Sequence, residues 1–221
     1  MFTGLIKHLP TIEECSKMGD GSVLLRIKFY KINDSSVSAS EQWGYFKSIK
    51  IGDSIAINGI CLTATKIDAS DKIIDFFVSH ETIAKTTVLT MQKGMKVHAE
   101  LAMLASDRLG GHILTGHIDE VITLSSVREL GNSLVLKFTT SPKGGYFLIP
   151  KGSVAIDGVS LTINSVFKNT FEVCIIPHTW QNTTLNQLDV SHNNLCNCEF
   201  DYFAKIINKN IRQLGLKISK N

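Results

Sequence analysis

An internal repeat is the feature that most limits how this chain can fold. The segment Asn58-Gly59-Ile60-Cys61-Leu62-Thr63 returns later as Asp157-Gly158-Val159-Ser160-Leu161-Thr162. Two further pairs of segments flank it in the same order: Gly4-Leu5-Ile6 with Gly116-His117-Ile118, and His80-Glu81-Thr82 with Pro177-His178-Thr179. Because self-similarity at a long period marks a duplicated structural unit, the 221 residues are expected to form two similar domains.

The local patterns inside the repeat predict β-strands. Apolar, β-branched and aromatic residues dominate four segments, 23–29, 72–78, 134–138 and 171–176, and turn-forming residues bound each one. The Asn-Gly and Asp-Gly dipeptides favour tight hairpins, since both positions tolerate positive φ. We therefore predict an all-β fold of two tandem, similar antiparallel barrels, joined near residues 102–106, with a surface loop at residues 33–42.

The last segment has a different period. From Tyr202 to Leu216 apolar residues recur every three or four positions, which predicts an amphipathic helix, and Asp201 stands where a carboxylate caps a first turn. The predicted domains are 1–102, 103–201 and the helix 202–217. This helix has no counterpart in the first copy, so its apolar side must be buried elsewhere. We favour subunit association over packing on the chain's own barrels.

Composition narrows the classes of function. A net charge of +3, without clustered basic runs, gives no sign of nucleic-acid binding. The start of the chain lacks a signal pattern and no apolar stretch approaches 18 residues, so no membrane contact is expected and the cytoplasm is the predicted location. Five cysteines, an odd number without framework spacing, fit a reducing compartment.

Small polar groups recur beside the glycines that both copies of the repeat share. On a strand, Cys61 and Thr63 share one face, and so do Ser160 and Thr162. A hairpin built for folding alone would explain the glycines and leucines, but not the recurring polar face. His117 stands where the first copy has Leu5, which makes a catalytic role and a purely structural one equally plausible.

Two sequence features suggest metal sites only superficially. His112 and His117 lie among glycines and expected strand geometry, which oppose a helical pair of ligands. Cys196 and Cys198 lack the second ligand pair that zinc requires, so packing within a strand is the favoured interpretation. No metal site is predicted.

Taken in order, these motifs resemble the riboflavin synthase family of the alpha-chain type. The resemblance rests on the opening Met1-Phe2-Thr3-Gly4, both copies of the repeated hairpin, Gly110 to His117, Ile176 to Thr179 and Tyr202 to Lys205, and it spans essentially the whole chain. It implies two six-stranded barrels and a C-terminal helix that joins three subunits. It also implies transfer of a four-carbon unit between two molecules of 6,7-dimethyl-8-ribityllumazine, without a metal or redox cofactor. The products are riboflavin and 5-amino-6-ribitylamino-2,4(1H,3H)-pyrimidinedione.

The resemblance also implies site residues. The implied catalytic residues are Cys61, His117, Ser160 and Asp201. We expect His117, Ser160 and Thr162 to act together in the second barrel, while Cys61 and Thr63 serve the first and Asp201 lies near the interface. The implied substrate-binding residues are Gly4, Leu5, Ile6, Cys61, Leu62, Thr63, Phe77, Val78, Ser79, His80, Glu81, Thr82, Gly116, His117, Ile118, Lys151, Ser160, Leu161, Thr162, Cys174, Ile175, Ile176, Pro177, His178 and Thr179.

Two other classes of protein compete with this interpretation. A non-catalytic lumazine- or flavin-binding antenna protein on the same scaffold is the main alternative, and retention of the polar residues in both copies favours the enzyme. A single-barrel flavin reductase module is the other, but the chain lacks a βαβ dinucleotide-binding pattern. The sequence leaves open which barrel holds the donor, which group adds to the acceptor, and whether lumazine synthase is a partner.

Overall fold

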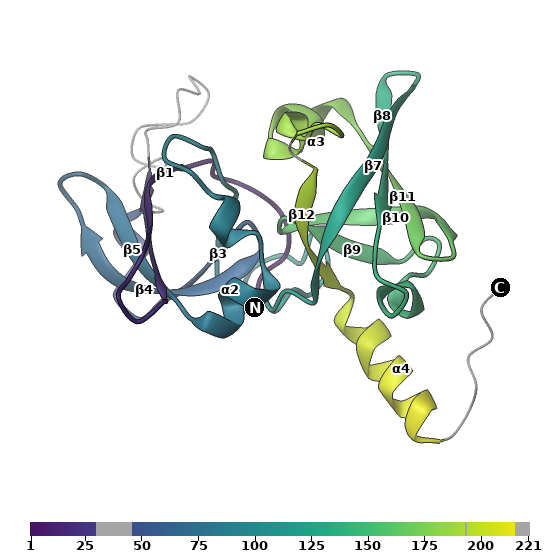
Figure 1. Cartoon of the computed structure of the whole chain (residues 1–221), viewed down its shortest axis with the longest axis horizontal. Helices are drawn as coiled ribbons and strands as arrows, with labels where there is room; N and C mark the ends of the chain where they lie inside the picture. Colours follow the sequence, from purple (N-terminus) through teal and green to yellow (C-terminus); the bar gives the residue numbers. More distant parts are fainter. Residues whose placement is uncertain (30–45, 193, 215–221) are drawn as a thin grey trace.

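The computed structural model describes residues 1–29, 46–192 and 194–214, and consists of two β units side by side with a helix at the end (Figure 1). The surface loop predicted at residues 33–42 lies outside this described part. Within the described part, no helix is both long and apolar enough to cross a membrane.

The first unit is a six-stranded antiparallel sheet with the order β1-β2-β5-β4-β3-β6. Isolated bridges from Thr11 to Lys96 and from His8 to Ala99 bring its two outer strands together. The strands are β1 (Thr11–Lys17), β2 (Val23–Lys28), β3 (Ser54–Ile57), β4 (Ile60–Asp68), β5 (Ile73–Val78) and β6 (Ala99–Leu101).

The second unit is a closed six-stranded barrel with the order β10-β11-β8-β7-β12-β9. Read from β7, this is the strand order of the first unit, so the sequence repeat corresponds to a repeated topology. The strands are β7 (Glu120–Leu130), β8 (Ser133–Thr139), β9 (Ser153–Ile156), β10 (Val159–Phe167), β11 (Thr170–Ile175) and β12 (Leu195–Phe200). The all-β prediction and the four predicted strands are confirmed.

Strict alternation explains why these segments form half-buried strands. In β2 every second residue is buried, and β11 shows the same period. Each unit has its own apolar core, and in the second the rings of Phe138 and Phe171 stack with centroids 5.6 Å apart. Cys196 and Cys198 are fully buried in this core as free thiols, which confirms the packing interpretation.

The repeated hairpins form the turns that their sequences predict and meet at the junction of the two units. Positive φ occurs at Asn58 (44°) and Gly59 (77°), and again at Asp157 (46°) and Gly158 (82°). A Cβ on Gly59 would lie 2.7 Å from the backbone nitrogen of Gly158, and one on Gly158 would lie as close to Gly59. Glycine is therefore required where the tips touch.

Two buried side chains cross this junction in equivalent positions. His98 of the first unit contacts the carbonyl oxygen of Asp157 through Nδ1, at 2.7 Å, and accepts the Thr184 N–H at Nε2, at 2.8 Å. Asn197 of the second unit donates to the carbonyl oxygen of Asn58 at 3.0 Å and accepts the Thr87 N–H at 2.8 Å. The two units are thereby joined by a nearly symmetric set of buried hydrogen bonds.

Short helices follow the fifth strand of each unit. α2 (His80–Lys85) is capped by the Ser79 hydroxyl, and α3 (Pro177–Gln181) has proline in its first turn. Both positions suit helix starts, because serine accepts an orphan N–H and proline lacks one. Three 3₁₀ turns are also present: η1 (Val88–Thr90), η2 (Gly144–Phe147) and η3 (Thr184–Gln187).

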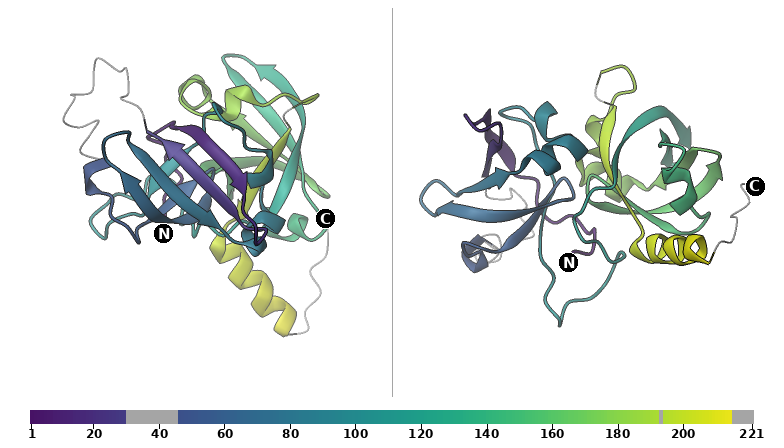
Figure 2. Two further views of the ribbon diagram at one scale, coloured as in Figure 1. Left: turned by 60° about the vertical axis from the view of Figure 1, so that its left-hand side comes forward. Right: turned by 60° about the horizontal axis from the view of Figure 1, so that its bottom comes forward.

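The predicted C-terminal helix is α4 (Tyr202–Gln213), which lies against the second unit and away from the first (Figures 1 and 2). The Asp201 carboxylate accepts the N–H groups of Phe203 and Ala204, which confirms the predicted cap. One side of α4 contacts its own barrel through Lys205, which pairs with Asp119 at 2.8 Å, and through the buried Asn208. The side chains that remain exposed include Phe203, Ile206, Ile207 and Leu214.

Candidate active site

The two repeated hairpins present equivalent polar faces to the outside of the units. In β4, Leu62 is buried in the core while Cys61 is half-buried and Thr63 is exposed. β10 repeats the pattern with Leu161 inside and with Ser160 and Thr162 outside. The prediction that 61 and 63, and likewise 160 and 162, share one face is confirmed. These side chains are accessible to a ligand that binds against the outer surface of each barrel.

Each polar hairpin is covered by a short extended segment from the other half of the chain, called a strip below. The first strip is Thr3-Gly4-Leu5, and the second is Thr115-Gly116-His117. The Ser160 N–H donates to the carbonyl oxygen of Gly4 at 2.9 Å, and the Cys61 N–H donates to that of Gly116 at 2.8 Å. A Cβ on Gly4 would lie 2.6 Å from the Ser160 Cβ, and one on Gly116 would lie 2.5 Å from the Cys61 Cβ. The strips are therefore exchanged between the units, and glycine is what lets them approach so closely.

Two buried glutamates hold these strips in place. Glu100 accepts the Thr3 N–H and hydroxyl at 2.7 Å each, and the Gly4 N–H at 3.0 Å. Glu199 makes the same three contacts to Thr115 and Gly116, between 2.6 and 2.9 Å. Burial raises the pKa of Glu100, and the hydrogen bonds from Thr3 and Gly4 oppose that rise. No local sequence pattern marks either carboxylate.

The exchange of strips places the backbone beside His117 against the first unit and not against Ser160. His117 follows Gly116 directly, and Gly116 is bonded to Cys61 of the first unit. Within one chain, His117 therefore belongs with the Cys61 face, whereas Leu5 follows the strip that lies against Ser160. Periodicity gave the strand faces correctly, but it carries no information about which strip crosses to which unit.

The side chain that the structure does bring to Ser160 is His112. Its Nδ1 lies 2.7 Å from the Ser160 Oγ, and the residue is buried. Burial lowers the pKa of His112, while the charge of Asp201 acts in the opposite direction. Ser160 and His112 thus form a hydrogen-bonded pair. The sequence pointed to no role for His112 beyond a superficial metal pair with His117, and its position just after Gly110-Gly111 was the available signal for a close backbone contact.

The remaining expected binding residues differ in exposure, and Val78 and Ile175 are buried in the cores of their units. Phe77 is 48% exposed at the end of β5, and Ile176 is 55% exposed at the end of β11. A Cβ on Gly21 would lie 2.9 Å from the His80 ring, so this ring is turned toward the β1–β2 hairpin. Lys151 has a positive φ of 68° and precedes Ser153, which pairs with Thr162.

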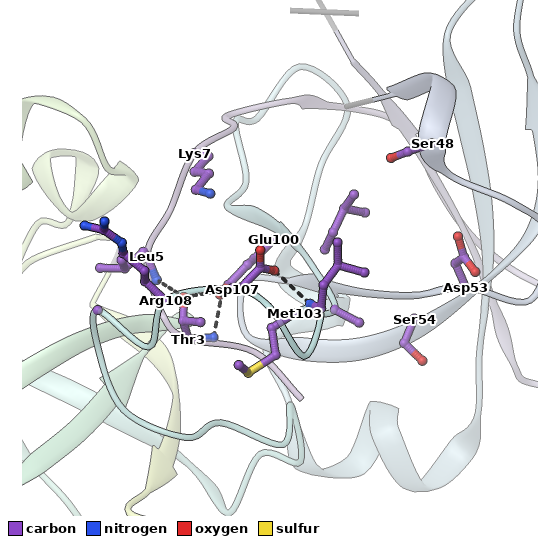
Figure 3. Close-up of a pocket in the computed structure, with 14 residues that line it drawn as sticks. Thr3, Leu5, Lys7, Ser48, Asp53, Ser54, Glu100, Met103, Asp107 and Arg108 are labelled. Carbon is purple, nitrogen blue, oxygen red and sulfur yellow. Dashed lines mark hydrogen bonds between the residues drawn. The ribbon is translucent and has the colours of Figure 1, made fainter. Parts of the chain in front are cut away.

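A cavity of about 810 Å³ adjoins the first strip. Figure 3 shows Thr3, Leu5 and Lys7 on one side, with Glu100 and Arg108 close by. Cys61 and Ser160 do not line it, so this cavity is separate from the two outer hairpin faces. In the described part of the chain no three metal-binding side chains cluster together.

Comparison with known proteins gives consistent matches. The model of the lumazine binding domain matches twice, at residues 3–102 and 115–201. The chain is 36% identical to a riboflavin synthase of Photobacterium phosphoreum, over 95% of this chain and 88% of that protein. It is 35% identical to a riboflavin synthase of Actinobacillus pleuropneumoniae, over 98% of this chain and 91% of that protein.

Solved structures match at the level of the fold. The crystal structure of LumP complexed with riboflavin gives a TM-score of 0.76, and that of LumP complexed with 6,7-dimethyl-8-(1'-D-ribityl) lumazine gives 0.74. Each is 22% identical in sequence and covers 90% of this chain and 99% of the LumP chain.

Proposed function

The chain belongs to the riboflavin synthase family and carries the lumazine binding domain twice, and on this premise we propose how its two halves share the reaction. It is an enzyme of the transferase class. Two molecules of 6,7-dimethyl-8-ribityllumazine react by transfer of a four-carbon unit, which yields riboflavin and 5-amino-6-ribitylamino-2,4(1H,3H)-pyrimidinedione. Identity of 35–36% to riboflavin synthases, against 22% to LumP, favours the enzyme over the antenna-type alternative.

The observation that carries the division of labour is the pair of equivalent but unequal polar faces. Two copies of one substrate need two similar surfaces, and donor and acceptor need different chemistry. The Cys61–Thr63 face, with His117 from its strip, binds one lumazine. The Ser160–Thr162 face, with Asp201 nearby, binds the other. Bringing two reactants together in this way can supply about 7–11 kcal/mol of the barrier in ideal cases.

The complete site is proposed to form between subunits. Both polar faces point outward from their own units, so each needs a second wall to enclose a planar ligand. The exposed apolar side of α4 offers a contact for further copies of the chain. Three subunits joined through α4 would place the first unit of one against the second unit of the next. Five free cysteines among the described residues fit the cytoplasm as the location.

The decisive experiment is incubation of chelator-treated protein with 6,7-dimethyl-8-ribityllumazine while flavin absorbance is recorded. We expect riboflavin to accumulate to half the amount of lumazine consumed. A sample containing the Ser160→Ala variant is the matched control and should accumulate riboflavin more slowly. Tight binding of the lumazine without turnover by the wild-type protein would contradict the proposal and favour the antenna-type protein.

A further inference from the structure

The contact between His112 and Ser160 is more than a packing contact. His112 Nδ1 and Ser160 Oγ are 2.7 Å apart, and the surrounding backbone fixes both residues. The His112 N–H donates to the Thr3 carbonyl oxygen at 3.2 Å, while the Ser160 N–H donates to Gly4 of the same strip. A Cβ on Gly111 would lie 2.1 Å from the Thr3 oxygen and 2.9 Å from the Ser160 Oγ. The missing side chain of Gly111 therefore lets the strip and the serine approach so closely.

The surroundings of the other ring nitrogen, Nε2, indicate whether His112 Nδ1 or Ser160 Oγ donates the hydrogen in this contact. Among residues 1–29, 46–192 and 194–214, His112 Nε2 is the only buried side-chain nitrogen or oxygen without a hydrogen-bond partner. A buried N–H without an acceptor is rarer in proteins than a buried acceptor without a donor. Burial also keeps the ring neutral, because it disfavours the charged form. The hydrogen accordingly lies on Nδ1 and is donated to Ser160 Oγ.

The first unit lacks this arrangement. Cys61 occupies the position equivalent to Ser160 and its backbone makes the equivalent bond to a strip. Its thiol has no hydrogen bond to any side chain in the described part of the chain. Ser160 and Cys61 therefore differ in two ways: one carries a hydroxyl and the other a thiol, and only Ser160 has a histidine within hydrogen-bond distance.

We propose that His112 is a positioning residue for the reaction. Its Nδ1–H donates a hydrogen bond to Ser160 Oγ. The serine O–H is then free to point at an acceptor atom of the lumazine bound on that face. Loss of a proton from the 7-methyl group spreads negative charge over the lumazine ring and its acceptor atoms. A donor held at such an atom stabilises this charge, and hydrogen bonds in a chain polarise one another. His112 would thus strengthen the donor without touching the substrate. This inference rests on the proposed function.

Replacement of His112 by two residues of different kind tests the role. His112→Phe keeps a ring but removes the donor, and His112→Asn places an amide N–H where Nδ1–H stood. We expect kcat of the Phe variant to fall at least about tenfold with little change in KM, since the bond strengthens only as charge develops. The Asn variant should stay within about threefold of wild type. His192→Phe, a change at an exposed histidine, is the matched control.

Two measurements separate failure of this inference from failure of the proposed function. Exchange of the 7-methyl protons of the bound lumazine with D₂O, followed by NMR, reports the deprotonation step without turnover, and it should slow in the Phe variant. The ¹⁵N-coupled imidazole proton of His112 should sit on Nδ1 and shift in Ser160→Ala. A proton on Nε2, or equal exchange in wild type and His112→Phe, would overturn the inference. Absence of riboflavin formation by the wild type would instead overturn the proposed function.

If His112→Phe does not fold, His112→Asn alone tests the donor role of His112. Slowing of its methyl exchange by tenfold or more, with an intact melting transition, would contradict the donor role. Exchange near the wild-type rate, together with the Nδ1 proton assignment, supports it. In Ser160→Ala the His112→Asn change should have no further effect, because the residue through which His112 acts is gone.

Discussion

At the scale of single residues, each repeated hairpin carries one small polar side chain that faces a strip from the other half of the chain. Cys61 faces Gly116 and Ser160 faces Gly4. The identity of the polar atom differs between the copies, while the backbone contacts that place it are the same. Residues that position the strips therefore help to shape the proposed site.

Glu100 gives the sharpest test of this positioning. In Glu100→Gln the amide NH₂ would face either the Gly4 N–H or the Thr3 donors, all of which the carboxylate now accepts. A buried donor left unsatisfied costs about 1–3 kcal/mol, so the free energy of unfolding should fall by that amount. Urea denaturation measures it. Glu129→Gln, at an exposed position in β7, is the control, and an equal effect in both variants would contradict the assigned role.

At the scale of elements, the hairpin tips are the points where the two units touch. Gly59→Ala adds a Cβ at a φ of 77° and within 2.7 Å of the Gly158 backbone. Gly94→Ala is a matched control, because its φ is 88° and the added carbon would have no neighbour within 4 Å. Both changes incur the strain of positive φ, about 1–2 kcal/mol. In Gly59→Ala, overpacking should lower the free energy of unfolding by roughly a further 1–3 kcal/mol. Calorimetric melting measures the loss of stability in both variants. Equal losses would mean that the contact between the hairpin tips is not tightly packed.

Helix α4 tests the proposed association of subunits. Ile207 is 57% exposed on the side of α4 that faces away from its own barrel. Ile207→Glu would place a charge in the proposed contact, so we expect trimers to be replaced by monomers that keep their melting transition. Lys209→Gln changes the charge of the same helix by the same amount at another exposed position. Analytical ultracentrifugation distinguishes the states, and a trimer that survives Ile207→Glu would rule out α4 as the contact.

The sequence predicted those features that depend on neighbours in the chain. Strand alternation, the Asn-Gly and Asp-Gly turns and the Asp201 cap are local, and all three were correct. The two strips and His112 could not be placed, because their partners lie far along the chain and no periodicity links them. His112 and Ser160 are separated by 48 positions, and their contact depends on the exchange of strips between units. Local patterns thus gave the two faces of the site but not its internal pairing.

At the scale of the whole molecule, the junction between the units contains two buried titratable groups whose pKa values are shifted in opposite directions. Burial raises the pKa of Asp157 to about 7, and burial lowers the pKa of His98 to about 4. The equivalent positions of the other unit hold Asn58 and Asn197, which make the corresponding hydrogen bonds without titrating. The repeat therefore supplies a neutral substitute for each group.

Stability against pH should reveal the two opposing groups when each is replaced by the other copy's residue. Between about pH 4 and 7 folded Asp157 binds more protons than the unfolded chain, so its contribution falls as pH rises. Between about pH 6.5 and 4 folded His98 binds fewer, so its contribution is present above pH 6.5 and is lost as pH falls. The two slopes nearly cancel in the wild type. Asp157→Asn should therefore become more stable from pH 4 to 6.5, on the order of 3 kcal/mol, and His98→Asn less stable. Urea unfolding at several pH values measures both slopes, and parallel curves for the two variants would show that these groups do not titrate at the junction.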